Sequence, residues 1–285
     1  MLLRIFGLTL AACSAVAAPV WADDAAWRAS DNATWRVQAG GGVLVTPDFQ
    51  GSSSHRTRAL PYISVDYGDL ISASVAGGVS ANLFREGDFV AGPIARFQFG
   101  QKEKDSPDLR GLGGVDPSVE VGGFVRYQRG PFSMRLTAGQ DVIGGHRGTA
   151  SELGGSLTKA IAQTGAGPVF VSAGPSVTFV TARVNRAFFG VDRVQSAASG
   201  LPIYRPSGGV QQFGLNATVI APLNRRLTVV GIAGYSRLLD AAADSPRVRL
   251  RGSPDQISGG VFSPTASRTD TPFGRVGNVR FRAVA

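Results

Sequence analysis

The chain has 285 residues, a net charge of +9, 43% hydrophobic and 17% charged residues, and a single cysteine. After residue 22 no apolar run approaches the ~20 residues that a membrane-spanning helix needs, which excludes a helical membrane protein. No basic run is interleaved with aromatic residues, so the positive charge does not indicate a nucleic-acid partner.

The first 22 residues form a separate unit. A short positive segment and the apolar stretch 5–18 lead to Ala22, which precedes Asp23 at a site of the type that signal peptidase cleaves. We expect residues 1–22 to be a cleaved signal peptide and residues 23–34 to be a periplasmic N-terminal segment. The apolar stretch is short for a retained anchor helix. Lipidation of Cys13 is the other alternative, whereas cleavage after Ala22 leaves no thiol for catalysis or metal binding.

From Arg36 onward the hydrophobic residues recur at every second position. In one example, Phe132, Met134, Leu136 and Ala138 alternate with Ser133, Arg135, Thr137 and Gly139. This alternation predicts β-strands. One face is apolar and the other is small and polar, which is typical of a transmembrane β-barrel with a polar lumen. A soluble lipocalin-like barrel is the alternative, but its interior would be bulky and apolar.

The connections between the strands predict how the barrel is oriented. Long polar connections at 46–57, 101–117, 142–150, 181–209 and 240–255 alternate with tight turns at Gln128–Pro131, Gln163–Pro168 and Pro222–Arg226. Outer-membrane barrels alternate surface loops with periplasmic turns in this way. If 71–83 forms two short strands that turn at Gly77-Gly78, an all-β antiparallel barrel of about 12 strands (10–12) spans residues 35–262.

The chain has two histidines that chemistry could use. Ser52, Ser53 and Ser54 precede His55, with Asp48 nearby, but no G-x-S-x-G elbow is present and adjacent side chains usually diverge. We interpret this stretch as a surface turn. His146 lies in a glycine-rich loop without a third metal ligand nearby. The sequence therefore predicts no catalytic, cofactor-binding or metal-binding residue.

Several short motifs follow one another in the order found in a known family. They are Trp35–Val37, Pro47-Asp48-Phe49 with Gly51-Ser52, Arg56-x-Arg58-x-x-Pro61, 108–113, 144–149, 188–191, 195–202, 236–239, Asp244-Ser245-Pro246 and 251–253. The chain resembles the MipA/OmpV family of outer-membrane proteins over residues 27 to about 262. The motif residues that we expect to be structural are Pro47, Asp48, Gly51, Arg56, Pro61, Gly190, Ser199, Gly200, Pro202, Ser245 and Pro246.

The resemblance implies a non-enzymatic barrel in the outer membrane of a Gram-negative-type bacterium. It also implies a scaffold that links a lytic murein transglycosylase to a murein synthase. Arg56 and Arg58 are expected at the level of lipopolysaccharide phosphates, and 191–198 is expected to be a short helix. The alternatives are a narrow pore for small solutes and a lipid-modifying enzyme.

The C-terminal part departs from the family pattern. An alternating strand begins at Gln256 and stops at Phe262, and Pro264 would remove a hydrogen-bond donor from a closing strand. We expect residues 263–285 to be an atypical tail outside the barrel. A frameshift after Phe262 is the hypothesis that explains it.

Overall fold

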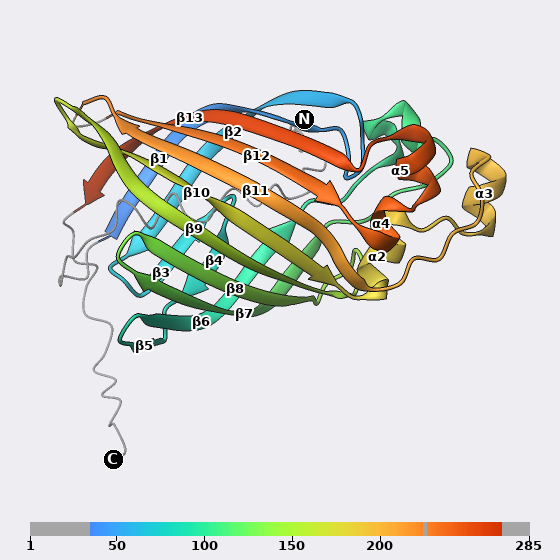
Figure 1. Cartoon of the computed structure of the whole chain (residues 1–285), viewed down its shortest axis with the longest axis horizontal. Helices are drawn as coiled ribbons and strands as arrows, with labels where there is room; N and C mark the ends of the chain where they lie inside the picture. Colours follow the sequence, from blue (N-terminus) through green and yellow to red (C-terminus); the bar gives the residue numbers. More distant parts are fainter. Residues whose placement is uncertain (1–34, 225–226, 270–285) are drawn as a thin grey trace, which may run out of the picture.

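The structure, a computed structural model, describes residues 35–224 and 227–269. Thirteen antiparallel strands dominate it, and they run obliquely around one barrel (Figure 1). The strands are β1 (Trp35–Pro47), β2 (His55–Tyr67), β3 (Ile71–Ser74), β4 (Gly78–Ala81), β5 (Phe84–Glu86), β6 (Phe89–Gln98), β7 (Ser118–Arg129), β8 (Phe132–Asp141), β9 (Thr149–Thr164), β10 (Gly167–Val180), β11 (Gly209–Pro222), β12 (Thr228–Leu238) and β13 (Asp255–Thr269).

The barrel closes with 12 strand positions. Neighbouring strands pair in sequence order, and β1 pairs with β13. The short β4 and β5 both pair with β6, so they act as one interrupted strand and complete the circle. The expected hairpin within 71–83 is confirmed, since β3 and β4 pair around a turn at 75–77. Alternate residues of β6 direct their backbone groups toward β4 and β5, and Pro93 is one of them. Proline has no N–H, so Pro93 cannot donate a hydrogen bond at the break between β4 and β5.

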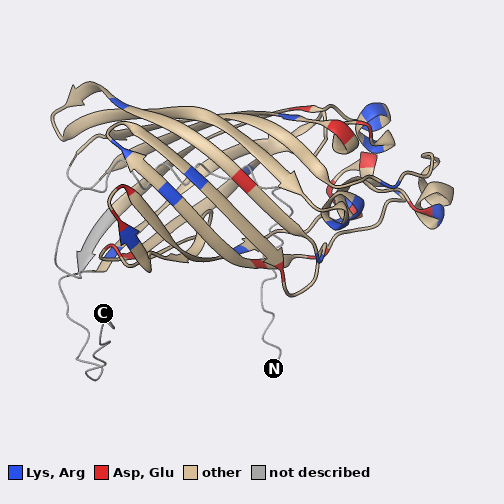
Figure 2. Cartoon of the chain, turned by 60° about the horizontal axis from the view of Figure 1, so that its bottom comes forward, with Lys and Arg blue, Asp and Glu red and all other residues tan. Residues whose placement is uncertain are grey.

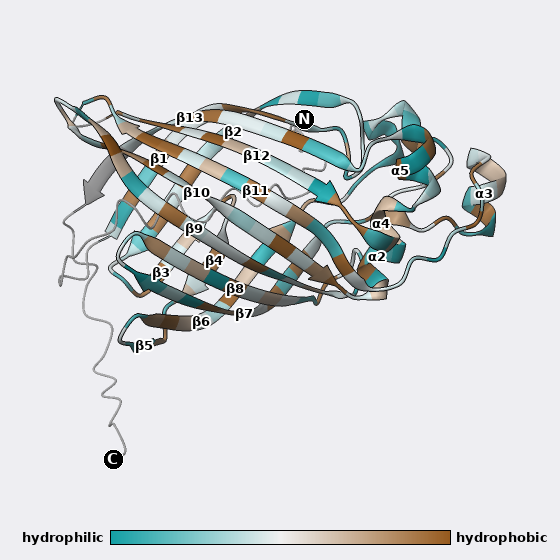
Figure 3. Cartoon of the chain, viewed as in Figure 1, coloured by the Kyte–Doolittle hydropathy of each residue, from teal (hydrophilic) through white to brown (hydrophobic). Residues whose placement is uncertain are grey.

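Apolar side chains face outward and polar side chains face the lumen, as the alternation predicts. Along β8, Phe132, Met134 and Leu136 are exposed, whereas Ser133, Arg135 and Thr137 are buried. Hydropathy alternates along the strands in Figure 3. Charged residues are few along the wall and more frequent at the ends (Figure 2). None of the helices in the described ranges is long and apolar enough to cross a bilayer.

The five long connections gather at one end of the barrel, where all the α-helices lie (Figure 1). The helical segments are η1 (Glu103–Asp105), η2 (Pro107–Leu109), α2 (Ala182–Phe189), α3 (Arg193–Ser199), α4 (Asp240–Ala243) and α5 (Pro246–Arg251). The expected helix within 191–198 is confirmed as α3, which has a capping box at Asp192 and ends at Gly200 with a positive φ of 76°.

Aromatic pairs lie near the short-turn end. Trp35 contacts Tyr67, and Phe89 contacts Tyr127, with ring centroids 4.8 and 4.9 Å apart. Such rings suit a membrane interface. Tyr62 lies outside this belt, because it occupies an even position of β2 and lines the lumen, where its ring centroid is 6.1 Å from that of Phe262.

The predicted end of the barrel at Phe262 is wrong. Strand β13 continues through Ser263–Thr269 and pairs with β1 as far as Thr269↔Trp35. Gly40 lies opposite Pro264, and a Cβ at Gly40 would be 2.2 Å from the Ser263 carbonyl oxygen, so glycine permits this close pairing. Residues 1–34, with Cys13 and the predicted cleavage site, and residues 270–285 lie outside the described residues.

Candidate functional site

The long connections pack against one another and form what we call the cap (48–54, 99–117, 142–148, 181–208 and 239–254). Two apolar clusters hold it together. One comprises Phe49, Leu109, Leu112, Val191 and Leu201, and the other comprises Phe189, Leu238, Ala242 and Val248. The first draws residues from three connections, and the second draws them from two connections and the end of β12 (Thr228–Leu238), because no single connection can bury its own apolar residues. The cap is therefore a folded unit rather than a set of independent loops.

Arg247 of α5 lies at the centre of the cap. Its guanidinium is 4.6 Å from the Phe49 ring centroid and 5.8 Å from that of Phe189. It donates to the Phe188 carbonyl, to the Gln50 carbonyl and to Gln101 Oε1. Burial lowers the pKa of Arg247 to about 9. The side chain thus remains charged at neutral pH, where its cation–π contacts and hydrogen bonds compensate the loss of water.

A second arginine ties the projecting α3 to the rest of the cap. Arg251 donates to the carbonyls of Asp108 and Arg110 in the β6–β7 connection, and also to the Ser199 carbonyl. Gln195 Nε2 reinforces the joint by donating to the Leu112 carbonyl at 2.6 Å. These bonds fix a helix that otherwise points away from the barrel (Figure 1).

The first connection is locked to the last one. Gly51 has φ of +95°, a conformation that disfavours side chains, and its N–H donates to Gln256 Oε1 at 3.0 Å. Gln256 Nε2 returns a bond to the Ser52 carbonyl, and the Ser253 N–H donates to the Gly51 carbonyl. A Cβ on Gly51 would lie 2.7 Å from Val248 Cγ2. Glycine is therefore required here for both backbone and packing reasons.

The structure does not bring Ser52–Ser54, His55 and Asp48 together as a hydrolytic site. Asp48 pairs with Arg56 at 3.0 Å, and Arg56 also donates to the Asp105 carbonyl. Ser52 Oγ accepts from the Ser54 N–H, while His55 is exposed and has no hydrogen bond to a serine or to Asp48. Arg56 thus lies on β2 and bonds two cap residues, while its expected position at the lipopolysaccharide level stays a prediction.

The other histidine has a structural environment that the sequence did not reveal. His146 Nδ1 accepts from the Gly148 N–H at 3.0 Å, so Nε2 carries the proton and faces Glu120 Oε1 at 3.4 Å. Glu120 also accepts from Arg96 and Gln98. His146 thereby joins the cap to the lumen wall. Among the described residues no group of three His, Cys, Asp or Glu is arranged for a metal ion.

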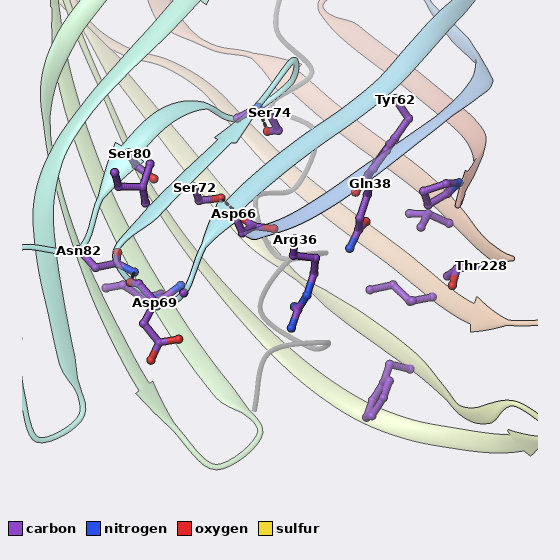
Figure 4. A pocket seen from close by; sticks show the side chains of 18 of the residues that line it. Arg36, Gln38, Tyr62, Asp66, Asp69, Ser72, Ser74, Ser80, Asn82 and Thr228 are labelled. Atoms are coloured by element: carbon purple, nitrogen blue, oxygen red, sulfur yellow. Dashed lines mark hydrogen bonds between the residues drawn. The ribbon is translucent and has the colours of Figure 1, made fainter. Parts of the chain in front are cut away.

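Two cavities lie inside the barrel and meet at Gly77. The lower one, of about 290 Å³, is lined by Arg36, Gln38, Asp66 and Ser72, which point into it from β1, β2 and β3 (Figure 4). The upper one, of about 170 Å³, is lined by Arg96, Glu120 and Glu152 of the wall. Gln50, Val184 and Phe188 of the cap also line this upper cavity, so the cap roofs the lumen.

Residues 39–262 match the family described as MltA-interacting protein MipA. The chain belongs to the MipA family. This membership and the closed barrel place it in the outer membrane. No curated protein matches the chain.

The chain is also similar to solved outer-membrane barrels. Neisserial surface protein A is 9% identical, with 82% of this chain and 97% of that chain covered and a TM-score of 0.26. OprD from Pseudomonas aeruginosa is 11% identical, with 85% and 67% covered and a TM-score of 0.33. Because these TM-scores are low, the assignment of the chain to outer-membrane barrels rests on the family match and on the strand pairing.

The MipA-family motif residues singled out from the sequence lie mostly in the cap. Asp48, Gly51, Gly190, Ser199, Gly200, Pro202, Ser245 and Pro246 are there, whereas Pro47, Arg56 and Pro61 lie on β1 and β2. Ser245 Oγ donates to the Phe189 carbonyl at 2.7 Å, which joins two of these motifs. Sequence reasoning missed Arg247 and Gln256. The available signal for Arg247 was its position directly after Ser245-Pro246.

Proposed function

We propose that the chain is a non-conducting outer-membrane barrel that anchors a lytic murein transglycosylase and, through it, a murein synthase. The family description, MltA-interacting protein, carries this proposal. The cap supports it, because the roof held by Arg247 obstructs diffusion along the barrel axis. The fold and family fit a protein without an enzymatic role, and the described residues supply no nucleophile–base pair at the sites considered.

A periplasmic partner would bind the short-turn rim. This rim carries two exposed ion pairs, Arg85–Asp69 at 3.1 Å and Arg129–Asp88 at 4.0 Å. Exposed ion pairs contribute little to stability, so these charges are available to a partner without loss of the barrel. The apolar belt would contact outer-membrane lipid, and the cap surface would contact lipopolysaccharide.

Capture of a purified lytic murein transglycosylase by the detergent-solubilised full chain tests the scaffold role. The double variant Asp69→Lys/Asp88→Lys reverses two rim charges. Binding should weaken by about tenfold or more if the partner contacts these carboxylates through basic residues, because like charges would then face each other. Arg249→Asp reverses an exposed charge in the cap and serves as the matched control. Absence of binding by the unmodified chain would exclude the scaffold role.

A narrow pore for small solutes is the second candidate. Its support is the pair of cavities that meet at Gly77, since polar side chains line both of them. Conductance across planar bilayers separates the two functions. Regular current steps from the unmodified chain would favour the pore, whereas a silent bilayer that becomes conducting after Arg247→Ala would show that the cap is the barrier.

A further inference from the structure

The barrel wall is incomplete between β2 and β6. Strands β3 and β4 have four residues each, and in Figure 1 they stop well short of the cap. Strand β3 pairs with β2 only over Ser64–Tyr67, and β4 pairs with β6 at two positions. Residues 55–62 of β2 and 96–98 of β6 therefore have no strand beside them on this side in the described part of the chain.

The two strand edges direct backbone groups into this gap. The Ile63 carbonyl accepts from the Val75 N–H, so odd residues of β2 point away from β1. By alternation, the N–H and C=O groups of Thr57 and Ala59 face the gap. Pro61 lies at the same edge and has no N–H to leave unpaired. On β6, the Ala91 carbonyl faces β5, which by the same alternation directs the Phe97 backbone into the gap.

The gap has a defined frame, and we call it the window. Its lower border is the β3–β4 turn at 75–77. Its upper border is η1, held to β2 by the bond from Arg56 to the Asp105 carbonyl at 2.9 Å. Phe97 and Phe99 pack edge to face on the β6 side, with ring centroids 4.9 Å apart.

The upper cavity extends to this window. Ala76 and Gly77 of the lower border line it, and so do Phe97 and Phe99. Phe97 occupies an outward position and is 53% exposed, yet it also lines the lumen cavity. Phe97 therefore lies between the cavity and the membrane-facing surface of the barrel. Exposed Ile63 and Val75 flank the window, so it opens into the apolar belt of the barrel.

An open edge in contact with lipid is costly, since each unsatisfied backbone group costs several kcal/mol. Water from the cavity can pair with these backbone groups, whereas a ligand in the window must be polar on its cavity side and apolar on its membrane side. Inside the cavity, most polar side chains bond one another: Arg96 with Glu120, Gln211 with Asn185, Asn216 with Ser176. Glu152 lines the cavity without a hydrogen bond to another described residue, and Arg96 and Arg135 are the positive charges that act on it. Its side-chain oxygens can therefore accept hydrogen bonds from a ligand that donates them.

We propose that the window is a lateral binding site for a single-chain amphiphile with an ammonium head group. The head group enters the upper cavity and binds Glu152. The hydrocarbon chain passes between β2 and β6, against Phe97 and Phe99, into the membrane. Access is from the lipid side, because the cap covers the axial route.

Photo-crosslinking of the full chain in lipid nanodiscs tests this site. The probe is a dodecylamine with a diazirine in its chain, and labelled residues are mapped by mass spectrometry. Labelling should concentrate at 75–77 and 96–99, and excess dodecylamine should compete with it while dodecyl sulfate should not. Glu152→Gln should reduce labelling at least about tenfold, because a charge-assisted bond is lost. Glu86→Gln, at an exposed position of β5, is the matched control.

Three outcomes would overturn the proposal. Equal labelling around the apolar belt would exclude a site at the window. Window labelling that ignores Glu152→Gln, or that dodecyl sulfate displaces equally well, would exclude the ammonium head group. Cross-linked dimers joined through β2 would show that a strand of a second copy occupies the edge. Each variant is first checked for the gel-mobility shift on boiling that a closed barrel gives.

Discussion

The cap and the β3–β4 wall lie in one barrel, but they are stabilised in opposite ways. The cap is built from connections, yet it has two apolar clusters and a buried arginine bonded to three segments. The β3–β4 wall is built from strands, yet its ladders comprise four pairs with β2 and two with β6. In this protein, side-chain contacts stabilise the cap, whereas the β3–β4 part of the wall, which faces the membrane, has few backbone hydrogen bonds to its neighbours.

The largest effect is expected from Arg247→Ala. This change leaves buried carbonyls without their donor, and each such loss costs ~1–3 kcal/mol. We expect the cap to open and the connections 181–208 and 239–254 to become sensitive to protease added outside intact cells. Arg249→Ala on the same helix is the control, since Arg249 is exposed and its contact to Asp244 is 4.0 Å long. Equal protease resistance of both variants would show that Arg247 does not hold the cap.

A smaller effect is expected from Gly51→Ala. The left-handed backbone costs ~1–2 kcal/mol for a residue with a side chain, and the new Cβ would press on Val248 Cγ2 at 2.7 Å. Gly130→Ala is the control, because it also places alanine at a positive φ, +57°, but nothing lies within 4 Å of its Cβ. The temperature at which the folded gel band is lost should fall more for Gly51→Ala. Equal shifts would mean that the Val248 contact is unimportant.

Alkaline pH should loosen one joint of the cap. Tyr204 Oη donates to the Ala241 carbonyl at 2.9 Å, and burial, with Asp244 nearby, raises the pKa of the Tyr204 phenol. A raised folded-state pKa contributes stability that is fully present below the unfolded value of about 10 and is lost as pH rises through the folded value. Protease sensitivity of the cap should therefore increase above about pH 10. Tyr204→Phe should remove that pH dependence, and its persistence would assign it to another group.

The sequence predicts the wall better than the cap because the wall repeats a local rule. Alternation along Phe132–Asp141 identifies each face from neighbouring residues alone. The burial of Arg247 depends instead on Phe49 and Gln101, which lie far away in the chain, and no local pattern encodes it. The missed strand Ser263–Thr269 has a similar cause. Pro264 argues against a strand until its partner is known to be Gly40.

The smallest expected effect distinguishes the window from a complete wall without any substitution. Along β2, the amides of Arg58 and Leu60 face β1, whereas those of Thr57 and Ala59 face the window. Hydrogen exchange measured by NMR in nanodiscs should therefore be fast at Thr57 and Ala59 and slow at Arg58 and Leu60. On β11, which is paired along both sides, neighbouring amides should be uniformly protected. Uniform protection along β2 would mean that another strand completes the wall. Alternation that disappears when dodecylamine is added would instead mean that the ligand shields the same edge.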